Sequence, residues 1–217
     1  MVRGSCTALV GESGSGKTTL LRCFNAMVAP DEGAVLVGGR DVRDVDSVTL
    51  RRSVGYVQQE GGLLPHWTIL RNVSLVPWLA RDPDAVQRGR HALDLVGLSP
   101  RDFGERWPRE LSGGQRQRAA FARALAGEPE VVLLDEPFGA LDAITRIDVR
   151  RTFASLRARL GFSVLLVTHD LREAFDLADQ VAVMREGRTE QIGEPRSLLA
   201  GAETPYVAEL LEKAGIS

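Results

Sequence analysis

The chain has 217 residues, of which 44% are hydrophobic, and its formal net charge is -2 at pH 7. This length can bury one sizeable core with a smaller subdomain attached, and the balanced charge and scattered arginines argue against direct nucleic-acid binding. The longest apolar runs, such as residues 164–167, fall far short of the ~18 residues that a membrane span needs, so a partner would have to provide any link to a membrane.

The first predicted strand, residues 6–10, is short and apolar and leads into a glycine-rich loop at residues 11–18. A helix is expected to follow over residues 18–27, because the apolar residues there have helical spacing. The loop reads Gly-Glu-Ser-Gly-Ser-Gly-Lys-Thr and matches the phosphate-loop pattern G-x-x-x-x-G-K-[ST] at every required position. The alternative, a Gly/Ser turn that binds nothing, does not account for these spacings between a strand and a helix.

Such a loop binds phosphate through its backbone. Its N–H groups curl inward toward phosphate oxygens, and the helix N-terminus adds a partial positive charge. Lys17 would reach the β- and γ-phosphates, and the Thr18 hydroxyl would ligate Mg²⁺. The sequence therefore predicts a site for ATP and Mg²⁺. The nucleotide-binding residues predicted here are Gly11, Glu12, Ser13, Gly14, Ser15, Gly16, Lys17, Thr18 and Thr19.

The middle of the chain is predicted to be largely helical. Residues 34–39 indicate a hairpin, residues 54–58 a strand, and the glycines at 61 and 62 a flexible joint. Residues 69–126 then show a helical pattern with breaks at Pro77, Pro83, Pro100 and Pro108. We expect a helical subdomain over about residues 61–126, inserted between two parts of one core, residues 1–60 and 127–217.

Strands and helices alternate after residue 127. Strands are predicted at 131–134, 163–168 and 181–184, helices at 144–160 and 171–178, and a hairpin around Gly187 with two short helices beyond it. Continuous apolar strands that alternate with helices indicate a parallel sheet covered on both faces. The predicted fold class is α/β, a P-loop NTPase with a mostly parallel sheet flanked by helices, an antiparallel β portion and the inserted helical subdomain.

Two adjacent acids, Asp135 and Glu136, follow the apolar strand at residues 131–134. Carboxylates at the C-terminal end of a parallel strand point into the crevice where such sheets bind ligands. Asp135 is predicted to hold Mg²⁺ through water, because Mg²⁺ takes few carboxylates and keeps its hydration. Glu136 is left to polarise a water aimed at the γ-phosphorus, as a general base. Standing alone, the pair would more readily be interpreted as ending a strand and capping the following turn.

A second helix start lies at residues 111–115, Leu-Ser-Gly-Gly-Gln, before an Ala- and Arg-rich helix that runs to Leu125. Ser112 is a natural N-cap, and Gly113 and Gly114 are expected to leave their amides uncovered. The phosphate loop already serves the protein's own nucleotide, so this helix start needs another ligand. Two copies of the chain would supply it, if residues 112–115 of each meet the ATP held by the other.

In order and separation, these motifs resemble those of the ATP-binding cassette (ABC) family, over essentially the whole chain. The resemblance implies a RecA-like core and gives roles to three further residues. Gln59 would sense the γ-phosphate and Mg²⁺, Asp142 would contact the opposite protomer, and His169 would contact the γ-phosphate. Taken alone, Gln59 would be a solvated loop amide and His169 an ordinary strand-end histidine. The catalytic residues expected are Glu136, His169 and Gln59, the metal ligands Thr18, Gln59 and Asp135, and the further nucleotide-binding residues Ser112, Gly113, Gly114, Gln115 and Asp142.

Within the family, residues 58–68 and 76–79 are similar to the ATPases of bacterial osmoprotectant importers, which carry glycine betaine, choline or related quaternary amines. The segment after Gln59 is too apolar for a solvated loop, so Leu63, Leu64 and Trp67 are expected to be covered by core or by a partner. In relatives this surface receives a helix of the membrane subunit. For Trp67 and Trp78, packing in the core is an equal alternative.

Only ten residues precede Gly11, and none of them is aromatic. Members of the family usually carry a longer segment here, with a strand pair and an aromatic side chain that stacks on adenine. We therefore expect the adenine contact to be missing and a sheet edge to be exposed. Base stacking on an aromatic ring is worth ~1–3 kcal/mol, so ATP affinity is expected to fall about tenfold or more.

The resemblance implies an enzyme, the ATP-hydrolysing subunit of an importer at the cytoplasmic face of the cell membrane. Its implied partners are a second ATPase protomer, transmembrane permease subunits and, indirectly, a solute-binding protein, with no nucleic acid. A quaternary-amine osmoprotectant is the expected solute. One alternative is a soluble ABC ATPase outside transport, although the chain lacks a second cassette, long coiled-coil insertions and basic tails. The other is a subunit whose catalysis is impaired by the short N-terminus.

Overall fold

The computed structural model describes residues 2–59 and 61–215, so Met1, Glu60, Ile216 and Ser217 lie outside the described residues. The chain forms two compact units. The first comprises residues 1–50, 133–136 and 163–217, and the second comprises residues 51–132 and 137–162. The division into a core and a helical subdomain at about residues 61–126 stays a prediction, and Glu60, at its first boundary, is outside the described residues.

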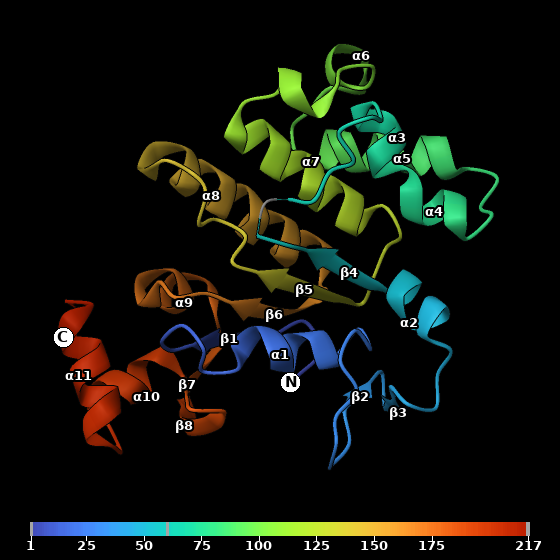
Figure 1. Ribbon diagram of the computed structural model, residues 1–217. Helices are drawn as coiled ribbons and strands as arrows, with labels where there is room; N and C mark the ends of the chain where they lie inside the picture. Colours follow the sequence, from blue (N-terminus) through green and yellow to red (C-terminus); the bar gives the residue numbers. More distant parts are fainter. Residues whose placement is uncertain (1, 60, 216–217) are drawn as a thin grey trace. The chain divides into compact units, whose positions relative to one another are not determined.

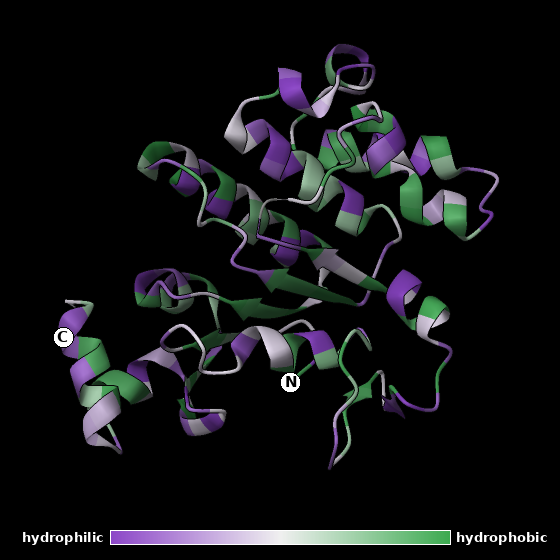
Figure 2. Ribbon diagram, viewed as in Figure 1, coloured by the Kyte–Doolittle hydropathy of each residue, from purple (hydrophilic) through white to green (hydrophobic). Residues whose placement is uncertain are grey.

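Parallel strands form the centre of the first unit (Figure 1). Strand β1 (Cys6–Val10) pairs in parallel with β6 (Ser163–Val167) and with β7 (Gln180–Arg185), while β8 (Arg188–Gly193) pairs antiparallel with β7. Both β1 and β6 are buried along their whole length, and Figure 2 shows the hydrophobic character of β6. The predicted mostly parallel sheet with an antiparallel portion is confirmed.

The helices of the first unit follow the strands as expected, with two differences. The unit contains α1 (Lys17–Cys23), α9 (Leu171–Leu177), α10 (Pro195–Ala200), α11 (Pro205–Lys213) and a short hairpin of β2 (Leu36–Val37) and β3 (Arg40–Asp41). Helix α1 ends four residues before the predicted end at Met27, because the backbone becomes left-handed at Ala26, with φ of 52°. Helix α2 (Ser47–Ser53) was not predicted, although Asp46 accepts a hydrogen bond from the Thr49 amide at 2.8 Å and so marks its start.

Helices make up most of the second unit. They are α3 (Ile69–Val73), α4 (Leu75–Leu79), α5 (Ala85–Leu95), α6 (Pro100–Phe103), the 3₁₀ turn η1 (Pro108–Glu110), α7 (Gly113–Leu125) and α8 (Ala143–Leu160), with β4 (Val54–Val57) beside the start of β5 (Val131–Asp135). The predicted break at Pro77 is wrong. Pro77 is the third residue of α4, in the first turn, where its missing N–H would have no helical partner.

An aromatic cluster forms the core of the second unit. Phe121 of α7 stacks on Phe153 of α8 with ring centroids 5.2 Å apart, and Phe138 lies 5.8 Å from Phe121. All three side chains are almost fully buried. Helix α8 ends at Gly161 in the left-handed conformation, φ 69°, as the sequence predicts. Within residues 2–59 and 61–215, no helix is both long enough and apolar enough to cross a membrane.

Candidate functional site

The phosphate loop joins β1 to α1 in the first unit, and its glycines are required by its backbone. At Gly11, φ is 146°, and a Cβ placed there would lie 2.1 Å from the Met184 carbonyl oxygen. Gly16 is left-handed, with φ of 94°, at the position where the chain enters α1. The first N–H groups of α1 have no partner within the helix, as at any helix start. The loop therefore presents backbone donors beside a closely packed strand end.

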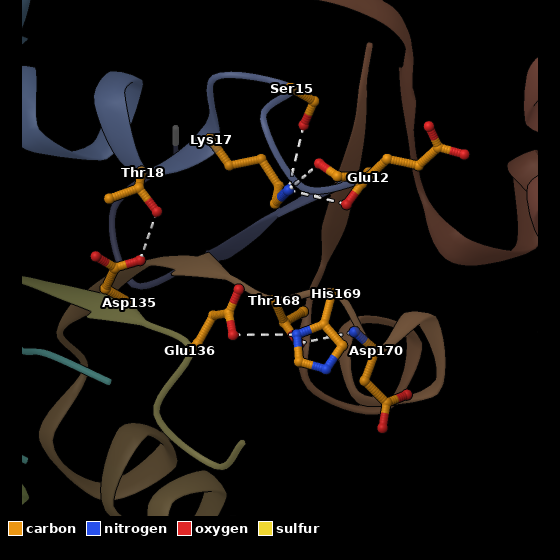
Figure 3. A network of polar contacts seen from close by, with 10 residues as sticks. Glu12, Ser15, Lys17, Thr18, Asp135, Glu136, Thr168, His169 and Asp170 are labelled. Atoms are coloured by element: carbon orange, nitrogen blue, oxygen red, sulfur yellow. Dashed lines mark hydrogen bonds and ion pairs between the residues drawn. The ribbon is translucent and has the colours of Figure 1, made fainter. Parts of the chain in front are cut away.

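Lys17 is the cation at the centre of this loop (Figure 3). Its Nζ donates to the carbonyl oxygens of Gly11 at 2.8 Å and Glu12 at 2.7 Å, and to Ser15 Oγ at 3.2 Å. The side chain is only 6% exposed. Burial lowers the pKa of Lys17, and the charges of Glu136 and Asp135 partly oppose that effect by raising it. The loop thus holds a desolvated ammonium within a ring of its own acceptors.

Thr18 and Asp135, two of the three ligands predicted for Mg²⁺, lie in contact with each other. The Thr18 hydroxyl donates to Asp135 Oδ1 at 2.8 Å, although the residues are 117 positions apart in the sequence. Asp135 is buried, and Arg22 of α1 lies 3.9 Å from its other oxygen. No group of three His, Cys, Asp or Glu side chains that could hold a metal occurs in the described part of the chain. A hydroxyl and one carboxylate fit a Mg²⁺ that takes its other ligands from phosphate and water.

Glu136 and His169 form the third contact of the first unit. Glu136 Oε2 lies 3.1 Å from His169 Nδ1, and the Glu136 amide donates to the Val167 carbonyl of β6 at 2.9 Å. The backbone at Glu136 is left-handed, with φ of 47°, a conformation that is strained for a residue with a side chain. The carboxylate is therefore directed by the backbone and held by the imidazole, next to Asp135 at the end of β5.

The helix start at Ser112 belongs to the second unit and is capped as predicted. Ser112 Oγ accepts from the Gln115 amide at 3.3 Å, and Gln115 Oε1 accepts from the Ser112 amide at 2.9 Å. This reciprocal pair is a capping box. It uses the Gln115 amide, so the amides that remain at the start of α7 are those of Gly113 and Gly114.

Gly114 differs from the expectation that both glycines leave their amides uncovered. It is buried, and a Cβ placed there would lie 2.4 Å from Thr145 Cγ2 of α8. The missing side chain at this position makes room for the neighbouring helix. Gly113 is partly exposed, and a Cβ there would meet only Leu141, at 3.5 Å.

Two other predicted residues also lie in the second unit. Asp142 is the N-cap of α8, and its Oδ1 accepts from the Thr145 amide at 3.0 Å. Hydrogen bonds from the Thr145 side chain and backbone lower the pKa of Asp142. Gln59 is exposed in the loop after β4. Asp142 thus also starts a helix, a role that was not predicted for it.

A cavity of about 330 Å³ lies in the second unit, and the apolar segment after Gln59 contributes Trp67 to its lining. Trp67 and Trp78 both line it, together with Arg71, whose guanidinium lies 4.2 Å from the centre of the Trp67 ring. Trp78 is 62% exposed, so packing in the core is excluded for this residue. Trp67 is half-buried.

Two polar residues of the first unit were not predicted from the sequence. Arg22 approaches Asp135, and its position four residues after Thr18 on the same helix was the available signal. Asp170 caps α9 directly after His169, because its Oδ1 accepts from the Glu173 amide at 3.2 Å. Asp followed three residues later by Glu is the capping pattern that could have revealed it.

Comparison with known proteins gives the family. A family profile described as ABC transporter matches residues 1–139. The chain is 41% identical over 215 residues to a choline transport ATP-binding protein of Bacillus subtilis (strain 168), and 43% identical over 210 residues to an osmoprotectant import ATP-binding protein of Salmonella typhimurium. An Fe(3+) ions import ATP-binding protein of Rhodococcus jostii is 50% identical over 213 residues.

These alignments cover 98%, 96% and 97% of this chain, and 56%, 55% and 60% of the respective relatives. The chain therefore spans just over half the length of the curated relatives it matches. Among solved structures, it is similar to a dimeric ATP-binding cassette in a post-hydrolysis state bound to ADP and Pi. That similarity has a TM-score of 0.78 and 32% identity, and it covers 89% of this chain and 87% of the other. The chain belongs to the ABC transporter family.

Proposed function

We propose that the chain is the ATP-hydrolysing subunit of an ABC importer, working at the cytoplasmic face of the cell membrane as a dimer bound to permease subunits. The observation that supports this best is the convergence of three contacts in the first unit. Lys17 is held in the phosphate loop, Thr18 meets Asp135, and Glu136 meets His169. Cation, metal ligands and general base are the parts that phosphoryl transfer to water requires.

The metal site follows from the Thr18 and Asp135 pair. Both side chains present oxygen to the same point, and Thr18 stands at the start of α1 beside the phosphate loop. Mg²⁺, when bound, neutralises charge on the phosphates. Lys17 supplies a second positive charge, and its burial strengthens the attraction because little water screens it. The chain then binds nucleotide mainly through the phosphates.

Glu136 acts as the general base in this proposal. Its carboxylate accepts a proton from water as the water oxygen bonds to the γ-phosphorus and the bond to the bridging oxygen of ADP breaks. His169 positions that carboxylate through the 3.1 Å contact. The left-handed backbone of Glu136 and the hydrogen bond from its backbone N–H to β6 restrict the carboxylate further. Gln59 senses the γ-phosphate and Mg²⁺, and Asp142 and residues 112–115 contact the opposite protomer.

The partner permease is proposed to dock at the cavity lined by Trp67 and Trp78. An exposed Trp78 beside a cavity with apolar walls is more typical of an interaction surface than of a solvated one. Arg71 adds a cation to the lining, over the ring of Trp67. A helix of a membrane subunit is the occupant that the importer function requires.

A quaternary-amine osmoprotectant is the proposed solute, delivered by a solute-binding protein. Support comes from the similarity to choline and osmoprotectant import proteins, whereas the similar Fe(3+) import protein represents the competing assignment. The solute is chosen by other subunits, so the test is chemical identification. The complex should be purified from native membranes, and its bound solute and permease identified. A permease complex loaded with a metal ion would overturn the solute proposal but leave the ATPase function intact.

The ATPase function itself is tested on the purified chain. Steady-state hydrolysis of ATP should require Mg²⁺ and should be abolished by Lys17→Ala. The exposed Glu186→Gln variant serves as a matched control and should retain the parent rate. A parent chain that binds no ATP and hydrolyses none would overturn the proposal. Recovery with ribosomes or DNA in place of a permease would favour an ABC ATPase outside transport.

A further inference from the structure

Arg123, near the C-terminal end of α7, bonds to the loop that follows β4. Its guanidinium donates through Nη1 to the Gly62 carbonyl at 2.6 Å and through Nη2 to the Gly61 carbonyl at 2.9 Å. The pair of bonds is bidentate, the geometry for which arginine is better suited than lysine. All of these residues lie in the second unit.

The loop is shaped to receive this guanidinium. Gly61 and Gly62 are both left-handed, with φ of 72° and 60°. This conformation is readily adopted at two successive positions only when both residues are glycine. A Cβ at Gly61 would lie 3.2 Å from Ala120 Cβ, so the loop packs closely on α7. Burial of the guanidinium lowers the pKa of Arg123, because the charged form loses hydration there.

A second buried side chain of the helix faces the same loop. Gln117 is only 5% exposed, and its Oε1 would lie 3.5 Å from a Cβ placed at Gly61. Among the described residues, its amide nitrogen is one of the buried polar atoms without a hydrogen bond. Gln117 and Arg123 are six residues apart on α7. Ala120 lies midway between them and also packs against Gly61, so contacts with residues 61 and 62 recur along α7 from Gln117 to Arg123.

The two ends of α7 thus meet different parts of the proposed mechanism. Its N-terminus, at Ser112, is the proposed contact with the nucleotide of the opposite protomer. Its C-terminal part holds Gly61 and Gly62, which follow Gln59, the proposed sensor of the γ-phosphate, in the chain. A helix of 13 residues is about 20 Å long and moves as a rigid rod, so displacement at one end reaches the other.

We propose that Arg123 is a positioning residue that fixes the loop carrying Gln59 to α7, so that contact of Ser112 with nucleotide sets the position of Gln59. This proposal rests on the proposed ATPase function. Arg123 itself touches no reacting group in it. Arg123 contributes by holding the carbonyls of Gly61 and Gly62, so that the loop moves with α7. The single ammonium of a lysine cannot hold both carbonyls in the same geometry.

A double-mutant cycle tests the proposal. Arg123→Lys should lower the kcat for ATP about tenfold and leave the KM unchanged, because two charge-assisted bonds are replaced by one and the phosphate loop is untouched. In a Gln59→Ala background, the same substitution should have almost no further effect, since the residue it positions is gone. Additive losses in kcat would mean that Arg123 acts independently of Gln59, and would overturn the proposal.

Arg118→Lys is the matched control. Arg118 lies on the same helix but faces the turn at Gly97, 3.9 Å from the position of a Cβ there. It should leave kcat within about twofold of the parent value. An equal loss of kcat in Arg118→Lys and Arg123→Lys would indicate general weakening of the helix and would contradict the proposal.

Hydrogen exchange gives a readout that does not depend on activity. In Arg123→Lys, amides of residues 61–67 should exchange about tenfold faster than in the parent, while amides of α5 remain unchanged. Unchanged exchange in the loop would overturn the anchoring role. If the parent chain shows no ATPase activity, the proposed function fails, and the exchange measurement still decides whether Arg123 anchors the loop.

Discussion

His169 Nδ1 and Glu136 Oε2 lie 3.1 Å apart at the ends of β6 and β5. The imidazole is 64% exposed and the carboxylate 24%, so the histidine reaches inward from the surface to the acid. When Nδ1 carries the proton, it donates to the carboxylate and fixes its direction. This contact couples the proposed general base to a residue that is itself implied to contact the γ-phosphate.

Glu136→Gln should retain ATP binding and reduce turnover by about 10²–10⁴-fold, because the amide cannot accept a proton from water. ATP-bound dimers should accumulate, since hydrolysis no longer separates them. Binding is measured by calorimetry, turnover by phosphate release, and dimers by light scattering. Asp170→Asn, which alters the neighbouring helix cap, controls for local disturbance. Hydrolysis by Glu136→Gln at the parent rate would refute the general-base assignment.

His169→Gln should reduce turnover less than Glu136→Gln, because the histidine orients the base without replacing it. Glutamine can still donate a hydrogen bond, and His169→Ala cannot. His169→Ala should therefore hydrolyse ATP more slowly than His169→Gln. Their kcat values should be compared at saturating Mg²⁺ and ATP. Identical rates for the two variants would mean that the contact with Glu136 does not position the carboxylate.

Ser112→Arg should block ATP-dependent dimerisation while the monomer still binds ATP, since the phosphate loop lies in the other unit of the chain. A long cation at the capping position removes the Ser112 Oγ bond to the Gln115 amide and places bulk on the proposed dimer face. Ser112→Thr, which keeps a capping hydroxyl, is the control. Light scattering with a non-hydrolysed nucleotide is the measurement. Equal dimer fractions in both variants would contradict the shared site.

Lys17 gives a pH dependence of defined sign. Burial lowers its pKa from the ordinary 10.5, so the ammonium loses its proton at a lower pH than an exposed lysine does. ATP affinity should therefore decline as pH rises, beginning below 10.5. For folding the sign is opposite, because the penalty for burying the charge is fully present at low pH and is relieved as pH rises toward 10.5. In Lys17→Arg the charge persists throughout this range, so its affinity should depend less on pH. If Kd depends equally on pH in the parent chain and in Lys17→Arg, deprotonation of Lys17 is not the cause of the pH dependence.

Local sequence patterns were enough to predict the phosphate loop, β1, β6 and the capped start of α7, because each depends on neighbours within a few residues. The relative placement of side chains did not follow from them. The hydroxyl of Thr18 meets Asp135 across 117 positions, and the sequence could indicate only that both belong to one site. Gly114 shows the limit most clearly, since its role depends on Thr145 of a helix that begins 29 residues later.

Gly114→Ala should destabilise the second unit by about 1–3 kcal/mol, because the new Cβ would lie 2.4 Å from Thr145 Cγ2 and must push α7 from α8. Thr145→Ser removes that methyl group and keeps the hydroxyl that hydrogen-bonds to Asp142. The double variant should regain much of the lost stability. Urea unfolding of the parent, both single variants and the double variant measures the coupling. Gly113→Ala is the matched control, because its Cβ would have an ordinary contact with Leu141 at 3.5 Å. If Thr145→Ser fails to restore stability, steric contact with α8 is not what requires glycine at position 114.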